Sequence, residues 1–163
     1  MSKPIIALLY DFDKTLCTQD MQNYAFIPSL GMTPEEFWRE ANGFGRQEHM
    51  DGILAYMYTM LRKSREKGLS FSRGDLVEMG RSIVLFPGVR DWFARINAFG
   101  ESLGVEVEHY ILSSGLREII EGSGISMDIL QMPGKIAALS LLDIRCRRVD
   151  RFITRIGFGA GGH

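Results

Sequence analysis

The sequence predicts an α/β protein with a parallel sheet and a block of helices inserted after the first strand. Two apolar runs, at residues 5–10 and 105–112, each lead into acidic or small polar residues. Helical patterns separate the two runs, and strands that alternate with helices favour a parallel sheet. Residues 21–86 contain several helical patterns and no strand pattern, so this stretch is longer than an ordinary crossover.

Composition sets the broad class. The chain has 163 residues, enough for one domain with its own core, and its formal net charge of −1 gives no overall attraction to nucleic acid or to an anionic membrane. No apolar run approaches the roughly 18 residues of a membrane span. Cys17 and Cys146 form neither a metal-binding spacing nor a disulfide framework, so we expect a cytoplasmic protein. The sequence does not indicate an oligomeric state.

The first elements have clear local signals. Ile5–Tyr10 is a continuous apolar run, which predicts a strand buried on both faces. Thr33 and Glu36 form a capping box with Pro34 at the first helical position, and Gly43 is the expected stop, so a helix is predicted from Pro34 to about Asn42.

Further elements follow from spacing and caps. A helix is predicted over 51–67, with Gly68 as its stop and with apolar residues at 53, 54, 57, 58 and 61. Ser72 and Asp75 predict the start of another helix over 73–83. A helix with Trp92, Phe93 and Ile96 on one side should end near Gly104, before a second strand over 105–112 and a short helix from about 116.

Two aspartates follow the first strand directly. In an extended chain Asp11, Asp13 and Thr15 would point one way, and Phe12 and Lys14 the other. Ligands of open parallel sheets bind at this carboxyl edge, and two ionised carboxylates so close need a cation, for which Mg²⁺ is the natural choice. One carboxylate can attack phosphorus while the other moves a proton, which suits phosphoryl transfer.

An alternative is that Asp11 caps a turn and Asp13 is solvated, since short motifs occur by chance. The context favours chemistry, because a buried-looking strand leads in and the second predicted strand ends in Ser113, Ser114 and Gly115. Lys14 is expected to face away from the site, and Cys17 to be a small buried residue.

The segment "IIALLYDFDKTL" resembles motif I of the haloacid dehalogenase (HAD) superfamily, and "HYILSSG" resembles its motif II. The helix in "FPGVRDWFARI" is also similar to the family's, and the inserted helices resemble the C1-type cap of phosphoserine phosphatase-like members. The resemblance covers roughly residues 4–125. It implies a Rossmann-like core at 1–20 and 87–163 and a helical cap at 21–86.

The resemblance also implies roles for the residues that match. Asp11 would be the nucleophile and Asp13 the general acid and base. The side chain of Asp11 and the backbone carbonyl of Asp13 would hold magnesium. Ser113 would bind a phosphoryl oxygen, although a strand-end hydroxyl that caps the next helix is the alternative. Ser114 and Gly115 are expected at the start of that helix, where free N–H groups favour an anion. A second aspartate indicates a phosphatase of small phosphorylated metabolites.

After about Ile125 the family's pattern is lost. Lys135 is the best candidate for the basic residue of motif III, and Asp143 and Asp150 are weak candidates for further metal ligands. Residues 126–163 contain no glutamate, and five arginines crowd together, namely Arg145, Arg147, Arg148, Arg151 and Arg155. We therefore expect a truncated or frame-shifted member whose sheet is incomplete and whose first strand lies at an exposed edge.

Three functions remain open from the sequence. The first is a magnesium-dependent phosphomonoesterase that forms an aspartyl-phosphate. The second is a catalytically impaired relative that keeps the fold and some phosphate affinity. The third is an interaction module that uses the basic tail, although a basic segment without aromatic residues is a weak signal for nucleic acid. In the inserted helices Arg46, His49 and Arg62 are candidates to contact a substrate, with a solvated helix face as the alternative.

Overall fold

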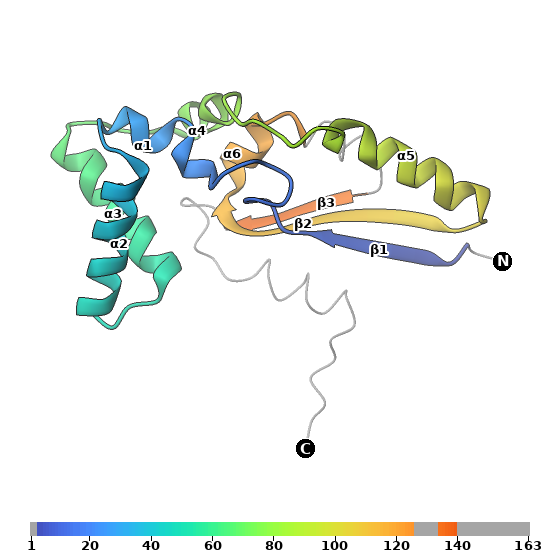
Figure 1. The fold of residues 1–163 in the computed structure, drawn as a ribbon, viewed down its shortest axis with the longest axis horizontal. Helices are drawn as coiled ribbons and strands as arrows, with labels where there is room; N and C mark the ends of the chain where they lie inside the picture. The colour runs from blue at the N-terminus through green and yellow to red at the C-terminus, as the bar shows by residue number, and fades with distance from the viewer. Residues whose placement is uncertain (1–2, 126–133, 140–163) are drawn as a thin grey trace, which may run out of the picture.

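The computed structural model describes residues 3–125 and 134–139. Its parallel sheet has the strand order β1-β2-β3, formed by β1 at Ile5–Tyr10, β2 at Glu106–Leu116 and β3 at Gly134–Leu139. Helix α5 lies along one face of the sheet, and α2 and α3 lie beyond the carboxyl ends of the strands (Figure 1). This mixed α/β architecture with a parallel sheet agrees with the predicted class.

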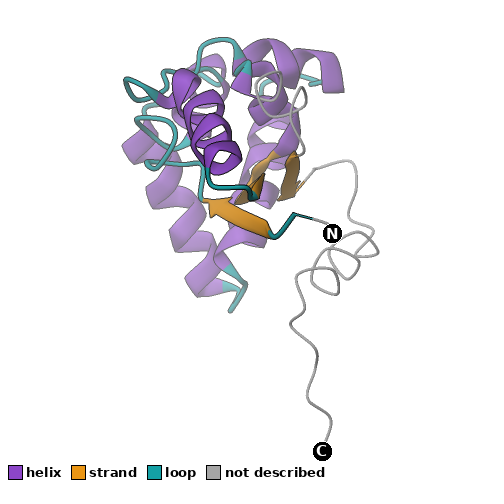
Figure 2. Ribbon diagram, turned by 90° about the vertical axis from the view of Figure 1, so that its right-hand side faces the viewer, coloured by secondary structure: helices purple, strands orange, loops and turns teal. Residues whose placement is uncertain are grey.

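The first strand lies at the edge of the sheet. Within the described part of the chain β1 pairs only with β2, in a parallel register that sets Tyr10 beside Ile111. The side chains of Ile5 and Leu9 are 58% and 46% exposed. The prediction of a strand buried on both faces is therefore wrong, because the face of β1 that carries Ile5 and Leu9 is exposed in the described structure. The expected exposed edge is confirmed for the described residues, and Figure 2 shows this strand at the border of the structure.

Helix α5, at Val89–Ser102, packs on the face of the sheet that carries Val107 and Ile111. Its Phe93 is fully buried, and at Gly100 an added Cβ would lie 2.5 Å from a methyl group of Val107. Glycine at this position lets the helix approach the strand closely. Of the predicted apolar side only Trp92 differs, since it lies at the margin and is 37% exposed.

A chain of hydrogen bonds joins α5 to the two strands it covers. The indole Nε1–H of Trp92 donates to the Tyr10 hydroxyl over 3.0 Å, and that hydroxyl lies 2.9 Å from Nδ1 of His109. The other ring nitrogen of His109 lies 3.1 Å from Oδ1 of Asn97. Together these contacts fit a neutral His109 that accepts at Nδ1 and donates at Nε2. Burial lowers the pKa of His109, which agrees with the neutral form.

Most of the other helices are inserted between β1 and α5. They are a 3₁₀ turn, η1, at Met21–Asn23, followed by α1 at Phe26–Ser29, α2 at Pro34–Gln47, α3 at Gly52–Glu66 and α4 at Arg73–Gly80. None of the helices in the described ranges combines the length and apolar character that a membrane crossing requires.

Helix α2 begins as predicted and ends later. The Thr33 side chain accepts the N–H of Glu36, and the Glu36 carboxylate accepts the N–H of Thr33, which completes the capping box. The predicted stop at Gly43 is wrong, because the helix continues to Gln47. It ends where His49 takes a left-handed backbone conformation, with φ of 51°. A single glycine weakens a helix without terminating it, whereas a left-handed residue reverses the chain.

Helix α3 begins after its cap Asp51, whose side chain accepts the N–H groups of Ile53 and Leu54. It ends before Gly68, as predicted. Its predicted apolar face is only partly the buried one. Leu54, Tyr58 and Leu61 are exposed, whereas the buried residues of the helix are Ala55, Tyr56, Thr59, Met60 and Ser64.

Helix α4 starts from the predicted capping box of Ser72 and Asp75 and ends at Gly80, three residues before the expected Ile83. It packs against α6, at Arg117–Gly122, through two glycines. A Cβ added to Gly122 would lie 1.8 Å from the carbonyl oxygen of Val77, and one added to Gly80 would lie 2.2 Å from that of Ile119. The crossing of these helices therefore depends on the absence of both side chains.

The chain enters and leaves the inserted helices at one place. Cys17 and Leu85 form an antiparallel bridge, with the N–H of Thr18 donating to the Val84 carbonyl over 3.0 Å. The Tyr24 hydroxyl lies 2.7 Å from the Thr18 hydroxyl and 3.2 Å from the Val84 carbonyl oxygen. The two connecting segments are thus held together as a short two-stranded junction, 16–18 with 84–86.

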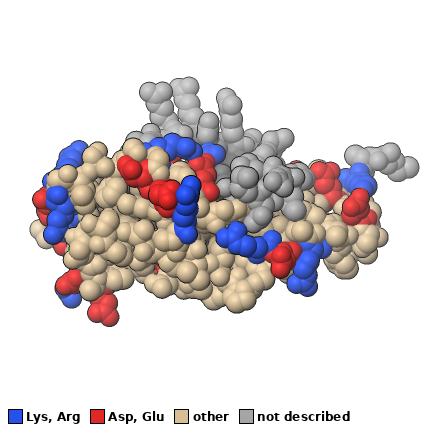
Figure 3. Space-filling view, turned by 90° about the horizontal axis from the view of Figure 1, so that it is seen from above, with Lys and Arg blue, Asp and Glu red and all other residues tan. Residues whose placement is uncertain are grey.

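Charges of both signs are interspersed over the described surface seen in Figure 3, and neither sign dominates that face. This distribution agrees with the nearly neutral composition of the chain.

Candidate active site

The candidate site lies where β1 and β2 end side by side. Asp11 follows the last residue of β1, which pairs with Ile111, and Ser113 lies two residues further along β2. Parallel pairing therefore sets the aspartates and the serines at the same edge of the sheet, as the sequence predicted for the two strand ends.

A tight turn follows Asp11 and places its neighbours. The Phe12 carbonyl oxygen accepts the N–H groups of Thr15, Leu16 and Cys17 over 3.3, 2.9 and 3.1 Å. Lys14 adopts a left-handed conformation, with φ of 59°. The strict alternation expected for residues 11–15 is therefore wrong, because the chain turns where alternation needs an extended backbone.

The turn nevertheless brings Thr15 back to Asp11. The Thr15 hydroxyl donates to Oδ2 of Asp11 over 3.1 Å. Both residues are exposed, so the Asp11 carboxylate remains open to a ligand from solvent. A carboxylate fixed by one hydroxyl, with its other oxygen available, is suited to act as a nucleophile or as a metal ligand.

Asp13 has a different environment from Asp11. It is half-buried, and its Oδ1 accepts the backbone N–H of Met21 over 2.8 Å. Burial raises the pKa of Asp13 to about 6, and the negative charges of Asp20 and Asp11 act in the same direction against the lowering effect of the Met21 N–H. A carboxyl group with this pKa can give or accept a proton near neutral pH.

Met21 links the two strand ends and was not predicted. Its N–H binds Asp13, and its sulfur accepts the backbone N–H of Leu116 over 3.1 Å. A Cβ at Gly115 would lie 2.0 Å from the terminal methyl of Met21, so a larger residue there would displace the thioether. Gly115 therefore has a packing role, and the sequence carried no signal that pairs Met21 with it.

Tyr56 and Gln22 also reach the site, and the sequence did not single out either. The Tyr56 hydroxyl donates to the carbonyl oxygen of Ser114 over 2.6 Å, from a helix far away in the chain. Burial raises the pKa of Tyr56, the charge of Asp13 adds to this, and a hydrogen bond with Gln22 opposes it. Gln22 is only 2% exposed, and its Oε1 has no hydrogen-bond partner among the described residues.

The serine segment differs from its expected form. Ser113, Ser114 and Gly115 belong to the extended end of β2, and the next helix begins at Arg117, so they do not start a helix. Ser113 Oγ accepts the N–H of Gly115 over 3.0 Å, which leaves its own O–H available as a donor. Ser114 is exposed and is fixed through its carbonyl group.

Of the remaining candidates from the sequence, the structure describes the backbone position of Lys135. Lys135 is the second residue of β3, paired with Tyr110, and thus lies three residues before the position that pairs with Ser113. Asp143, Asp150 and the arginines of the tail lie outside the described residues. Among residues 3–125 and 134–139 there is no group of three acidic, histidine or cysteine residues that could hold a metal ion.

Two residues near the aspartates have structural roles. Lys14 is exposed and forms an ion pair with Asp20, its Nζ 2.7 Å from the carboxylate. Cys17 is fully buried, and burial together with the charge of Asp13 raises the pKa of its thiol to about 11. The burial of Cys17 agrees with the expectation of a small buried residue.

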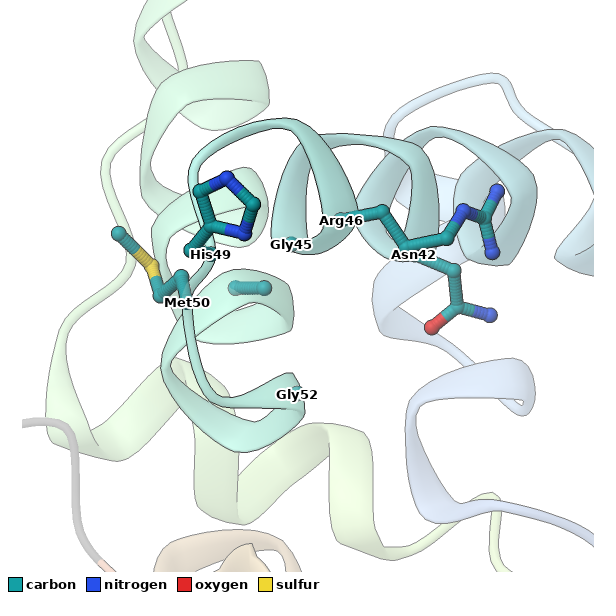
Figure 4. A pocket seen from close by; sticks show the side chains of 7 residues that line it. Asn42, Gly45, Arg46, His49, Met50 and Gly52 are labelled. Atoms are coloured by element: carbon teal, nitrogen blue, oxygen red, sulfur yellow. The ribbon is translucent and has the colours of Figure 1, made fainter.

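Of the three candidates in the inserted helices, Arg62 pairs with Glu40 and lies over the rings of Phe44 and Tyr58. Arg46 and His49 instead line a hollow between α2 and α3 (Figure 4).

No family model matches the chain. A curated but uncharacterized protein of Borreliella burgdorferi is 31% identical over 132 residues, an alignment that covers 75% of this chain and 46% of that protein. The chain thus spans less than half the length of this relative.

A solved structure of a haloacid dehalogenase-like family hydrolase from Xanthomonas campestris is 18% identical, with coverage of 94% of this chain and 70% of that chain. The TM-score of this likeness is 0.41.

Proposed function

We propose that the chain is a magnesium-dependent phosphatase of the HAD type, which hydrolyses a small phosphomonoester through an aspartyl-phosphate. The observation that carries this proposal is the pair of unlike carboxylates at the end of β1. Asp11 is exposed and held by Thr15, whereas Asp13 is half-buried with a pKa of about 6. Two carboxyl groups with different environments can divide the roles of nucleophile and proton carrier.

In the first step an Asp11 oxygen forms a bond to phosphorus while the bond from phosphorus to the ester oxygen breaks. Asp13, protonated, gives its proton to the leaving oxygen. In the second step Asp13 takes a proton from a water molecule that attacks the phosphorus, and the Asp11 carboxylate is released with inorganic phosphate. The Ser113 O–H, which no described acceptor engages as Oγ accepts the Gly115 N–H, would donate to a phosphoryl oxygen during both steps.

The donor atoms at this edge suit magnesium in part. Mg²⁺ prefers oxygen ligands and is often held by one or two carboxylates with several waters. The side chain of Asp11 and the backbone carbonyl of Asp13 would hold the ion, whose charge offsets that of the phosphate group. Lys135, the candidate for the basic residue of motif III, would supply a further positive charge.

Hydrolysis of an aryl phosphate, measured with and without magnesium, tests the proposal. We expect turnover by the wild type that needs magnesium, no turnover by Asp11→Asn, and a loss of about 100-fold or more in Asp13→Asn. Asp91→Asn, which removes an exposed carboxylate on α5, is the matched control and should keep full activity. Activity that survives Asp11→Asn would refute the nucleophile assignment.

A second candidate is a phosphate-binding protein without turnover. It is favoured by one observation, that the described residues offer no cluster of three metal-binding side chains. Under this alternative, inorganic phosphate binds in equilibrium dialysis while the aryl phosphate is not hydrolysed at any magnesium concentration.

The same alternative assigns the hydroxyl groups of Thr15 and Ser113 to phosphate binding. It therefore predicts that Thr15→Val and Ser113→Ala weaken the uptake of phosphate.

A further inference from the structure

A hollow of about 440 Å³ lies at the corner between α2 and α3, away from the aspartates in sequence (Figure 4). We call it the α2–α3 cup, and it is lined by Asn42, Gly45, Arg46, His49, Gly52 and Ala55, with Met50 beside them. The mechanism proposed above uses none of these residues.

Small residues make the floor of the cup. A Cβ added to Gly45 would lie 3.0 Å from the Cβ of Ala55, so α2 and α3 approach each other closely at this point. Both residues are buried, although they line the hollow. A floor of this kind leaves the space above it free for a ligand of a few atoms.

Hydrogen-bond donors lie at two sides of the floor. Asn42 and Arg46 lie one helical turn apart on α2, at one side of the cup, and His49 lies at the other side (Figure 4). A guanidinium group, an amide and an imidazole together offer several N–H donors and one permanent positive charge. A planar or tetrahedral oxyanion is the ligand that such a group recognises.

The charge of Arg46 is not neutralised within the described residues, where it has no ion pair. Arg62 on the neighbouring helix is the contrast, since it pairs with Glu40. The acidic residues that flank the cup in sequence are Glu48 and Asp51, and the Asp51 carboxylate is engaged by the N–H groups at the start of α3.

The backbone at His49 supports a role for its side chain. In α3 and α5 the corresponding left-handed residue after the helix is glycine, at Gly68 and Gly104, with φ of 65° and 73°. A histidine in this conformation is strained relative to glycine. At this corner the sequence thus keeps an imidazole at the edge of the cup in spite of the strain.

We propose that the α2–α3 cup binds a small oxyanion, a carboxylate or a phosphate group, through Arg46 with Asn42 and His49. This inference does not depend on the phosphatase proposal. Helix α3 connects the cup with the strand ends, because Gly52 lies one helical turn before Tyr56, whose hydroxyl binds Ser114.

The test is a titration of the ¹⁵N-labelled full chain with inorganic phosphate and, separately, with succinate, at constant ionic strength. The amide signals of Gly45 and Gly52 report on the cup. We expect saturable shifts with at least one of the two anions, and a loss of about tenfold in affinity in Arg46→Ala. Arg39→Ala, which removes the same charge two turns earlier on α2, is the matched control and should bind as the wild type does.

His49→Gly provides a second variant that does not endanger the fold, because glycine favours the left-handed conformation. We expect it to bind the anion more weakly while unfolding at a higher urea concentration than the wild type. Shifts that are absent with both anions, or that persist unchanged in Arg46→Ala, would overturn the inference. Because no hydrolysis is measured, a failure here leaves the phosphatase proposal to its own test.

Discussion

His109 shows how a single buried side chain makes stability depend on pH. It lies fully buried between β1, β2 and α5, with both ring nitrogens near hydrogen-bond partners. Protonation would place a positive charge in this apolar setting and would turn Nδ1 from an acceptor of the Tyr10 hydroxyl into a donor. The neutral ring is therefore the form that holds α5 to the sheet.

We predict that acid weakens the fold through His109. Its folded-state pKa lies below the ordinary 6.5, so the unfolded chain takes up this proton first as the pH falls. The contribution of His109 is complete above about pH 6.5 and declines below it. The measurement is urea unfolding of the wild type and of His109→Gln between pH 7.5 and 5.

The quantity to compare is the difference between the two proteins. The raised pKa of Asp13 acts in the opposite sense, because protonation of that carboxyl favours the folded state as the pH falls through about 6. Asp13 is present in both proteins, so its effect cancels. A gap in unfolding free energy that stays constant across this range would contradict the role given to His109.

At the scale of elements, contacts between helices depend on where side chains are absent. Helices α4 and α6 cross at Gly80 and Gly122, and α2 approaches α3 at Gly45. Gly43 has no such role, since a Cβ there would meet nothing within 4 Å. Replacing a glycine by alanine is therefore expected to destabilise the fold at some positions of this chain and to stabilise it at others.

We predict that Gly122→Ala lowers the unfolding free energy by about 1–3 kcal/mol, because its methyl group would collide with the Val77 carbonyl. Gly43→Ala should instead raise it by about 0.5–1 kcal/mol, since alanine favours the helix interior. Urea unfolding of both variants gives the comparison. Equal effects of the two substitutions would show that the α4–α6 crossing is looser than described.

Helix starts could be predicted from the sequence, because capping chemistry is local. Thr33, Asp51 and Ser72 each bind N–H groups within three residues of themselves. Which face of a helix becomes buried depends instead on elements that are distant in sequence. Two sides of α3 carry apolar residues, and the side with Leu54 and Leu61 remains exposed because α2 packs on the other.

The candidate site could be predicted only in part, because some of its contacts are local to the strand ends and others are not. Asp11, Asp13 and Ser113 follow apolar runs, and strand ends meet at one edge of a parallel sheet. Tyr56 and Met21 were missed because their partners, Ser114 and Leu116, are distant in sequence. An ordinary tyrosine or methionine in a helical pattern carries no mark of such a contact.

On the scale of the whole molecule, the described sheet has an open edge along β1. Among residues 3–125 and 134–139 no strand pairs with the outer side of β1, and its apolar side chains are exposed at Ile5, Ile6 and Leu9. Exposed apolar strands of this kind add further strands from other chains. The molecule as described is therefore prone to self-association through β1.

We predict that Ile5→Lys reduces this self-association, because a charge on the edge opposes strand pairing. Size-exclusion chromatography with light scattering, over a range of protein concentrations, measures it. Leu54→Lys is the matched control, since Leu54 is 57% exposed and Ile5 58%, but Leu54 lies on a helix. If Leu54→Lys reduced self-association more than Ile5→Lys does, the exposed face of α3 and not β1 would be the associating surface.

The junction of 16–18 with 84–86 has a consequence for how such a chain can diversify. Its backbone hydrogen bonds already close the loop that contains the inserted helices, so a longer or shorter insertion would change the closure entropy only slightly. Helices could be gained, lost or exchanged beyond this closure while Ile5–Tyr10 keeps its register with β2. The inserted helices can then change while the strand ends keep the arrangement of Asp11 and Ser113.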